Sequence, residues 1–192
     1  MSLPQKPQRS RHRAALRHTR ILCLAAFLTA LSFLLGLLAK TIQGAGPLRF
    51  TIEGLPVVLA GITLGPLYGA TVGIAADLLS CLLAGQTPLP LITLGAATVG
   101  LVPGLIALAR RRHYCPTATP PRYRQMLLFD GSAHLFGSIL LKTAALTEFY
   151  GISAVILWRT PLYIGVSIIE SYLLYILLRS ATVRREIERL IK

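Results

Sequence analysis

Four cations stand apart from the other basic residues of the chain and are the first candidates for chemistry. They are Lys40, Arg49, Lys142 and Arg159. They lie in or beside apolar segments, where a charge is costly and usually faces a cavity or a partner. Ammonium and guanidinium groups bind small anions, and an arginine offers a planar fork for a carboxylate. The alternatives are internal ion pairs, such as Lys142 with Glu148, and a helix-end position for Lys40.

Asp77 is a carboxylate in the middle of an apolar segment and therefore needs a partner. A carboxylate can accept two hydrogen bonds from an amidine-like edge, such as the N3–H and 2-amino group of a pterin. A hydrogen bond to another helix, or a pair with a nearby arginine, would satisfy it equally well. Glu170 lies deeper in the last long apolar segment, where a packing role is at least as well supported.

Enzyme chemistry is not indicated by the sequence. There is no GxSxG, HExxH or Walker A motif. The histidines lie mostly in cytoplasmic stretches without metal-ligand spacing, and the cysteines form no CxxC. The histidines are His12, His18, His113 and His134. We therefore expect no enzyme, no metal and no cofactor, and any energy for pumping must come from another protein or an ion gradient.

The composition indicates a membrane protein. Hydrophobic residues make up 54% of the chain and charged residues only 14%, whereas a soluble domain carries about 25%. We predict an all-α integral membrane protein of 192 residues in one domain: a basic N-terminus (1–20), a six-helix bundle (21–179) and an amphipathic tail (180–192) on the inner membrane surface. The expected transmembrane helices are 21–39, 52–64, 67–83, 91–109, 126–146 and 155–178.

The basic residues support this topology. The net charge is +13, and most of the positive charge falls in the stretches 1–20, 110–124 and 179–192. Six spans place all three stretches on one side, as the positive-inside rule requires, whereas four or five spans would not. We expect a plasma-membrane protein with both termini cytoplasmic and the four isolated cations toward the outside. No aromatic-interleaved basic face suggests nucleic acid as a partner.

Three segments resemble a known family. RFTIEGLPVVLAGITLGPLYGATVGIAADLLSCLL (49–83) resembles the substrate-binding S components of energy-coupling factor (ECF) vitamin transporters, and is most similar to their folate-specific members. PLITLGAATVGLVPGL (90–105) and LKTAALTEFYG (141–151) are similar to later helices of that family. The resemblance implies a six-helix subunit with an outward vitamin pocket, which docks on a membrane coupling subunit and two ATP-binding subunits. Docking would use small residues of the first helix, here Ala26 and Ala30.

The resemblance also implies positions for the ligand. Arg49, Asp77 and Arg159 would fall at or near it. Folate-specific members commonly carry Asn-Thr and a nearby Trp where this chain has Lys142-Thr143 and Ala145, so Lys142 would serve a glutamate carboxylate. The expected substrate-binding residues are Arg49, Asp77, Lys142, Thr143, Tyr150, Trp158 and Arg159. High-affinity folate capture is the predicted function. The alternatives are another small vitamin, such as pantothenate, and a membrane scaffold subunit without a ligand.

Overall fold

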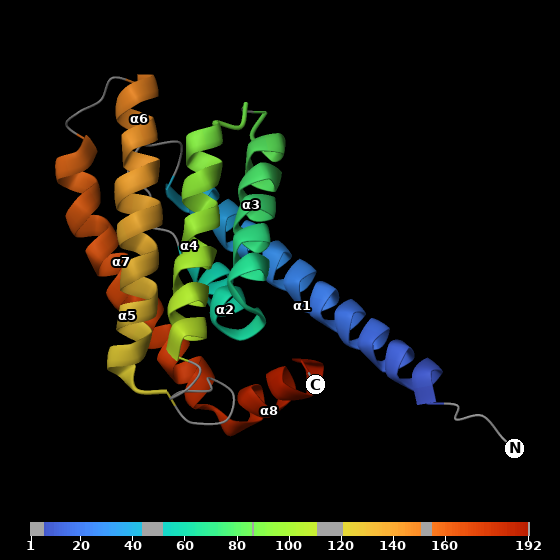
Figure 1. The fold of residues 1–192 in the computed structure, drawn as a ribbon. Helices are drawn as coiled ribbons and strands as arrows, with labels where there is room; N and C mark the ends of the chain where they lie inside the picture. The colour runs from blue at the N-terminus through green and yellow to red at the C-terminus, as the bar shows by residue number, and fades with distance from the viewer. Residues whose placement is uncertain (1–5, 44–51, 86, 111–120, 151–154, 192) are drawn as a thin grey trace, which may run out of the picture.

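The computed structural model describes residues 6–43, 52–85, 87–110, 121–150 and 155–191, and every regular element in these ranges is a helix (Figure 1). In chain order the elements are α1 (Lys6–Gln43), α2 (Gly54–Leu64), α3 (Pro66–Leu83), α4 (Pro90–Arg110), α5 (Tyr123–Ala133), the π-helix η1 (His134–Lys142), α6 (Thr143–Tyr150), α7 (Val155–Arg179) and α8 (Ala181–Ile191).

The all-α membrane architecture predicted from the sequence is confirmed, while the count of six spans stays a prediction. Among the described residues, four helical stretches are long and apolar enough to cross a membrane. They are Leu16–Ala39, Pro66–Leu83, Pro90–Arg110 and Thr160–Arg179. Helix α2 is apolar but shorter, and α5, η1 and α6 follow one another through the segment predicted as the fifth helix.

Helix α1 begins far earlier than the expected apolar span, at Lys6. The residues before position 21 are rich in Arg and Ala, which favour helix, so the helical conformation extends beyond the apolar part. Helix α3 begins with Pro66 in its first turn, after Gly65 with φ 111°. Pro is preorganised for a helix start and Gly tolerates positive φ, which explains the sharp break between α2 and α3.

Helices α2, α3 and α4 touch through glycine backbones. A Cβ added to Gly61 or Gly69 would collide with the carbonyl oxygen of Gly100 in α4. A Cβ on Gly73 would collide with the carbonyl oxygen of Ala96 in the same helix. Because these positions have no side chain, the three helices pack at backbone contact.

The π-helix is the main departure from the predicted fifth helix. Its wider turn is closed by the Thr143 hydroxyl, which donates a hydrogen bond to the carbonyl oxygen of Ser138 at 3.1 Å. Gly137 faces α4, where an added Cβ would lie 2.7 Å from the Gly95 carbonyl oxygen. Such π-helical turns recur at functional sites because they change the direction of the side chains that follow.

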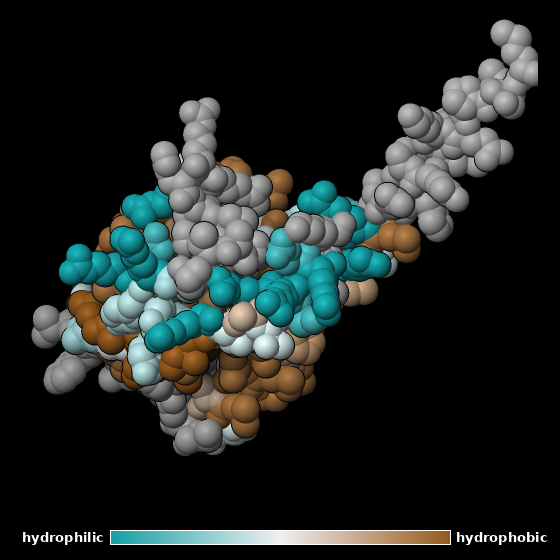
Figure 2. Space-filling view, turned by 90° about the horizontal axis from the view of Figure 1, so that it is seen from below, coloured by the Kyte–Doolittle hydropathy of each residue, from teal (hydrophilic) through white to brown (hydrophobic). Residues whose placement is uncertain are grey.

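One end of the bundle is polar. Helix α8 lies across the lower end in Figure 1, contacts α1 and α7, and buries Ile187 with Val183 against the core. The end of α4 and the start of α5 lie at this same end, and Figure 2 shows hydrophilic residues gathered over it. The described parts of the three basic stretches therefore gather at one end, while the predicted membrane topology stays a prediction.

Candidate functional site

The predicted carboxylate Asp77 lies in the C-terminal half of α3, and the C-terminal end of α3 lies at the upper end of the bundle, opposite α8 (Figure 1). The hydroxyl of Thr93 in α4 donates a hydrogen bond to Asp77 Oδ2 at 2.8 Å. The hydrogen bond between helices, which the sequence left open as an alternative, is therefore present. The Asp77 side chain remains half-buried and makes no other hydrogen bond to described residues, so it retains acceptor capacity.

Lys142 lies on the other side of α4, at the end of η1. It is half-buried, and its stem crosses Gly95, where an added Cβ would lie 2.7 Å from Lys142 Cγ. No ion pair joins Lys142 to Glu148 or to any other described residue. Lys142 is therefore a half-buried cation without an ion-pair partner among the described residues, and its role in binding stays a prediction.

Helix α4 separates these two groups. Thr93 and Gly95 are two positions apart and point to different sides of α4, one toward Asp77 and the other toward Lys142. The structure thus brings Asp77 and Lys142 to the same end of the bundle without contact between them. A ligand that touches both must extend over the upper end of α4.

The other predicted substrate-binding residues are placed less fully. Thr143 is buried, and its hydroxyl donates a hydrogen bond to the Ser138 carbonyl oxygen within the π-helix. Tyr150 ends α6, and Trp158 and Arg159 lie near the start of α7, which contacts α6. Their side chains, and Arg49 altogether, lie outside the described residues. Their role stays a prediction.

The predicted docking residues Ala26 and Ala30 are exposed on α1, whereas Ala25 and Thr29 face the bundle and are buried. Phe27, between them in sequence, is 63% exposed. The small residues thus lie on a face of α1 that no described part of the chain covers, which suits contact with another membrane helix.

A cluster of three ionisable side chains, missed by the sequence reasoning, lies inside the bundle. Asp130 of α5, His134 of η1 and Glu170 of α7 are 0%, 4% and 0% exposed. His134 Nε2 lies 2.6 Å from Glu170 Oε2 and 3.8 Å from Asp130 Oδ1. We call these three residues the buried cluster. The expectation that histidines lie in cytoplasmic stretches without metal-ligand spacing does not hold for His134.

A sequence signal for the buried cluster did exist. Asp130 and His134 are four positions apart, which places them on one face of a helix, inside a segment already predicted to cross the membrane. Glu170 was the other acidic residue seen deep in a span. What the sequence could not give is the packing of α7 against η1 that brings them together.

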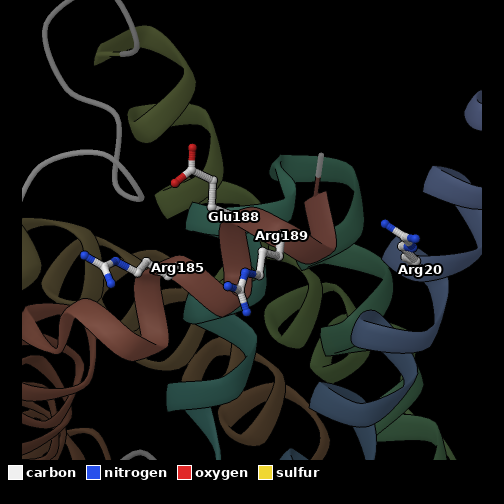
Figure 3. Close-up of a pocket in the computed structure, with 4 residues that line it drawn as sticks. All are labelled: Arg20, Arg185, Glu188 and Arg189. Carbon is white, nitrogen blue, oxygen red and sulfur yellow. The ribbon is translucent and has the colours of Figure 1, made fainter.

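A pocket of about 460 Å³ lies at the lower, polar end (Figure 3). It is lined by Arg20 of α1 and by Arg185, Glu188 and Arg189 of α8. Arg189 is paired with Glu186 at 2.7 Å. None of the predicted substrate-binding residues lines this pocket, whose lining comes from α1 and α8, whereas Asp77, Lys142 and Thr143 belong to α3, η1 and α6.

Comparison with known proteins gives one family and one fold. The family described as "ECF transporter, substrate-specific component" matches residues 20–191. A search of curated proteins gave no match. Among solved structures, the chain is similar to one described as "Crystal structure of FolT bound with folic acid", with a TM-score of 0.65, 20% sequence identity, and coverage of 86% of this chain and 97% of that one. At this identity the likeness establishes the fold.

Proposed function

The chain belongs to the substrate-specific components of ECF transporters, and from this premise we propose that the vitamin it captures is a folate. It is thus a subunit of a membrane transporter. The observation that carries the proposal is the fold, which matches FolT bound with folic acid over 86% of this chain. The positions of Asp77 and Lys142 supply the chemical support.

The proposed ligand extends over the upper end of α4. The pterin ring lies toward Asp77, whose carboxylate accepts hydrogen bonds from N3–H and the 2-amino group. The glutamate carboxylates lie toward Lys142, which has no ion-pair partner among the described residues. A carboxylate bound to a half-buried ammonium makes a charge-assisted hydrogen bond, which is stronger than a neutral one.

The remaining predicted residues complete this proposal. Arg49 and Arg159 would add cations for the second carboxylate, and Thr143, Tyr150 and Trp158 would line the pocket. Folate suits this arrangement because it combines an amidine-like edge with two carboxylates at the opposite end. Pantothenate offers a single carboxylate and no amidine edge, so it would leave Asp77 without a ligand partner.

The proposed assembly follows from the exposed face of α1. Ala26 and Ala30 would contact the membrane coupling subunit, which in turn joins two ATP-binding subunits. Both termini would be cytoplasmic, because the basic residues gather at the end that carries α8 (Figure 2). The upper end, with Asp77 and Lys142, then faces outward in the plasma membrane, where the vitamin is captured.

The test uses Trp158, the single tryptophan of the chain, as a fluorescence probe. Detergent-purified protein is titrated with folate and separately with pantothenate, alongside Arg159→Ala. We expect saturable quenching by folate only, weakened in Arg159→Ala. Calorimetry detects binding that does not change the fluorescence of Trp158.

The absence of folate binding by both methods would overturn the folate assignment. Binding of pantothenate instead would support the alternative vitamin. A scaffold subunit without a ligand predicts that Arg159→Ala impairs assembly or stability and leaves uptake by intact assemblies unchanged.

A further inference from the structure

The buried cluster has the donor set of a metal site. Its three inward atoms are His134 Nε2, Asp130 Oδ1 and Glu170 Oε2, and all lie within 4.8 Å of one another. One imidazole nitrogen and two carboxylate oxygens form a set that binds divalent transition-metal ions in proteins. Two ligands come from one helical run at a spacing of four, and the third comes from α7 across the packing interface.

Each of the three side chains is held by its second polar atom. His134 Nδ1 lies 3.1 Å from Ser138 Oγ, Glu170 Oε1 accepts a hydrogen bond from the Leu55 N–H at 3.2 Å, and Asp130 Oδ2 accepts one from Ser171 Oγ at 3.4 Å. In the tautomer that carries its proton on Nδ1, the Nε2 lone pair faces Glu170 Oε2 and would serve an ion that displaces this contact. Metal-binding histidines and carboxylates are oriented in this way by outer-shell partners. The other polar atom of each side chain, namely His134 Nε2, Asp130 Oδ1 or Glu170 Oε2, therefore faces the centre of the cluster.

One of these inner atoms has no hydrogen-bond partner among the described residues, although His134 Nε2 lies 3.8 Å from it. Asp130 Oδ1 is completely buried, on a side chain that is 0% exposed, and it forms no hydrogen bond with any described residue. The hydroxyl of Ser167, one turn before Glu170 on α7, is also buried and lies beside Asp130. A buried polar atom without a partner is costly, so its presence indicates a group that completes the site.

Charge balance is compatible with the same ligand. Two carboxyl groups beside one imidazole, away from water, must be neutralised by protons or by a bound cation. A divalent ion with a neutral imidazole balances both carboxylates. The start of α2 also packs directly on the cluster: a Cβ on Gly54 would lie 2.8 Å from Glu170 Oε2 and 3.2 Å from His134 Cε1.

We propose that Asp130, His134 and Glu170 bind a divalent transition-metal ion inside the bundle, for which Zn²⁺ is the probe. On binding, His134 Nε2 gives up its hydrogen bond to Glu170 and becomes a ligand, and any proton it carried is released to solvent. The ion links α5, η1 and α7, and through the Leu55 N–H it holds the start of α2. This site is separate from the proposed folate site and needs no folate.

The test measures metal content in protein produced without a histidine tag, from cells grown with added Zn²⁺. We expect Zn²⁺ equimolar with the chain by mass spectrometry, and a visible absorption band when Co²⁺ replaces it. His134→Ala should lose the ion. Ser138→Ala, which removes only the partner of Nδ1, should weaken Zn²⁺ binding by about tenfold, a response that a purely packing role for the cluster does not produce.

Matched controls exist outside the cluster. His18→Ala removes an exposed histidine, and Glu186→Gln neutralises an exposed glutamate. Both should retain the ion. Glu170→Gln keeps the shape of the side chain and serves if His134→Ala fails to fold. The proposal is overturned if the wild-type protein contains no Zn²⁺ after growth and dialysis with it, or if Glu170→Gln and wild type bind it equally. A cluster held together by protons alone would give the first of these results.

Discussion

The polar side chains at the upper end of the bundle and those in the buried cluster differ in burial and in how many of their hydrogen bonds are already formed. At the upper end, Asp77 and Lys142 are half-buried, lie on two sides of α4, and keep unused hydrogen-bonding capacity. In the buried cluster, Asp130, His134 and Glu170 are in contact, and an outward atom of each is already held. The first arrangement suits a ligand that binds and dissociates. The second suits a permanent contact, so the two regions should respond differently to mutation.

The largest expected effect is on stability, from His134→Ala. The change leaves two buried carboxyl groups without their imidazole partner, and an unsatisfied buried polar group costs about 1–3 kcal/mol, to which the void adds its own cost. Thermal unfolding in detergent should show a strong loss, with His18→Ala, an exposed histidine, unchanged. Equal unfolding temperatures for the two variants would show that the cluster is not the stabilising region.

The next effect is on binding, from Lys142→Met. Methionine keeps the apolar stem over Gly95 but removes the charge, so a charged hydrogen bond of about 1.5–3 kcal/mol is lost. Folate affinity should fall by roughly tenfold to a hundredfold while the unfolding temperature stays the same. Calorimetry measures the folate affinity and the unfolding temperature of the wild type and of the variant. Arg124→Gln, at the polar lower end, is the control and should bind folate as wild type does.

A third prediction concerns the scaffold that carries Asp77 and Thr93. Gly100→Ala places a methyl group into the backbone of Gly69, and such overpacking costs about 1–3 kcal/mol. Gly165→Ala is the matched control, because nothing lies within 4 Å of its added Cβ. The first variant should unfold at a lower temperature, and the second should not. If Gly100→Ala is neutral, the helices of the scaffold do not pack at backbone contact.

The smallest effect is expected from Thr93→Val. The change removes the hydroxyl that holds Asp77, an interaction worth about 0.5–1.5 kcal/mol. Folate binding should weaken a few-fold, because Asp77 is then less well oriented, with little change in unfolding. A loss as large as that of Lys142→Met would mean that Thr93 contacts the ligand itself.

The sequence predicted what depends on local pattern. Long apolar segments and the Gly65-Pro66 break gave the helices to within a few residues, apart from the early start of α1. The π-helix was missed, because the widened turn depends on packing against α4 at Gly137 and has no local pattern of its own. Asp77 was identified as needing a partner, but its hydrogen bond to Thr93 depends on how α3 and α4 pack.

The buried cluster shows the same limit more clearly. Asp130 and His134 are polar residues in an apolar segment, so the sequence marks them as unusual, yet their partner Glu170 is distant in the chain. Only the fold shows that the three meet. For Arg49 and Arg159, family resemblance remains the basis of the prediction, because their side chains lie outside the described residues.

The glycine contacts among α2, α3 and α4 have a consequence for movement. Side chains at a helix interface can exchange rotamers and so let one helix slide on another, but Gly61, Gly69 and Gly100 have none to exchange. These three helices therefore move as one rigid body. Gly137 of η1 packs against the Gly95 backbone of α4 in the same way, so η1 belongs to this body. A change of shape that opens the upper end is therefore expected where α7 contacts α2 and η1, an interface formed by side chains.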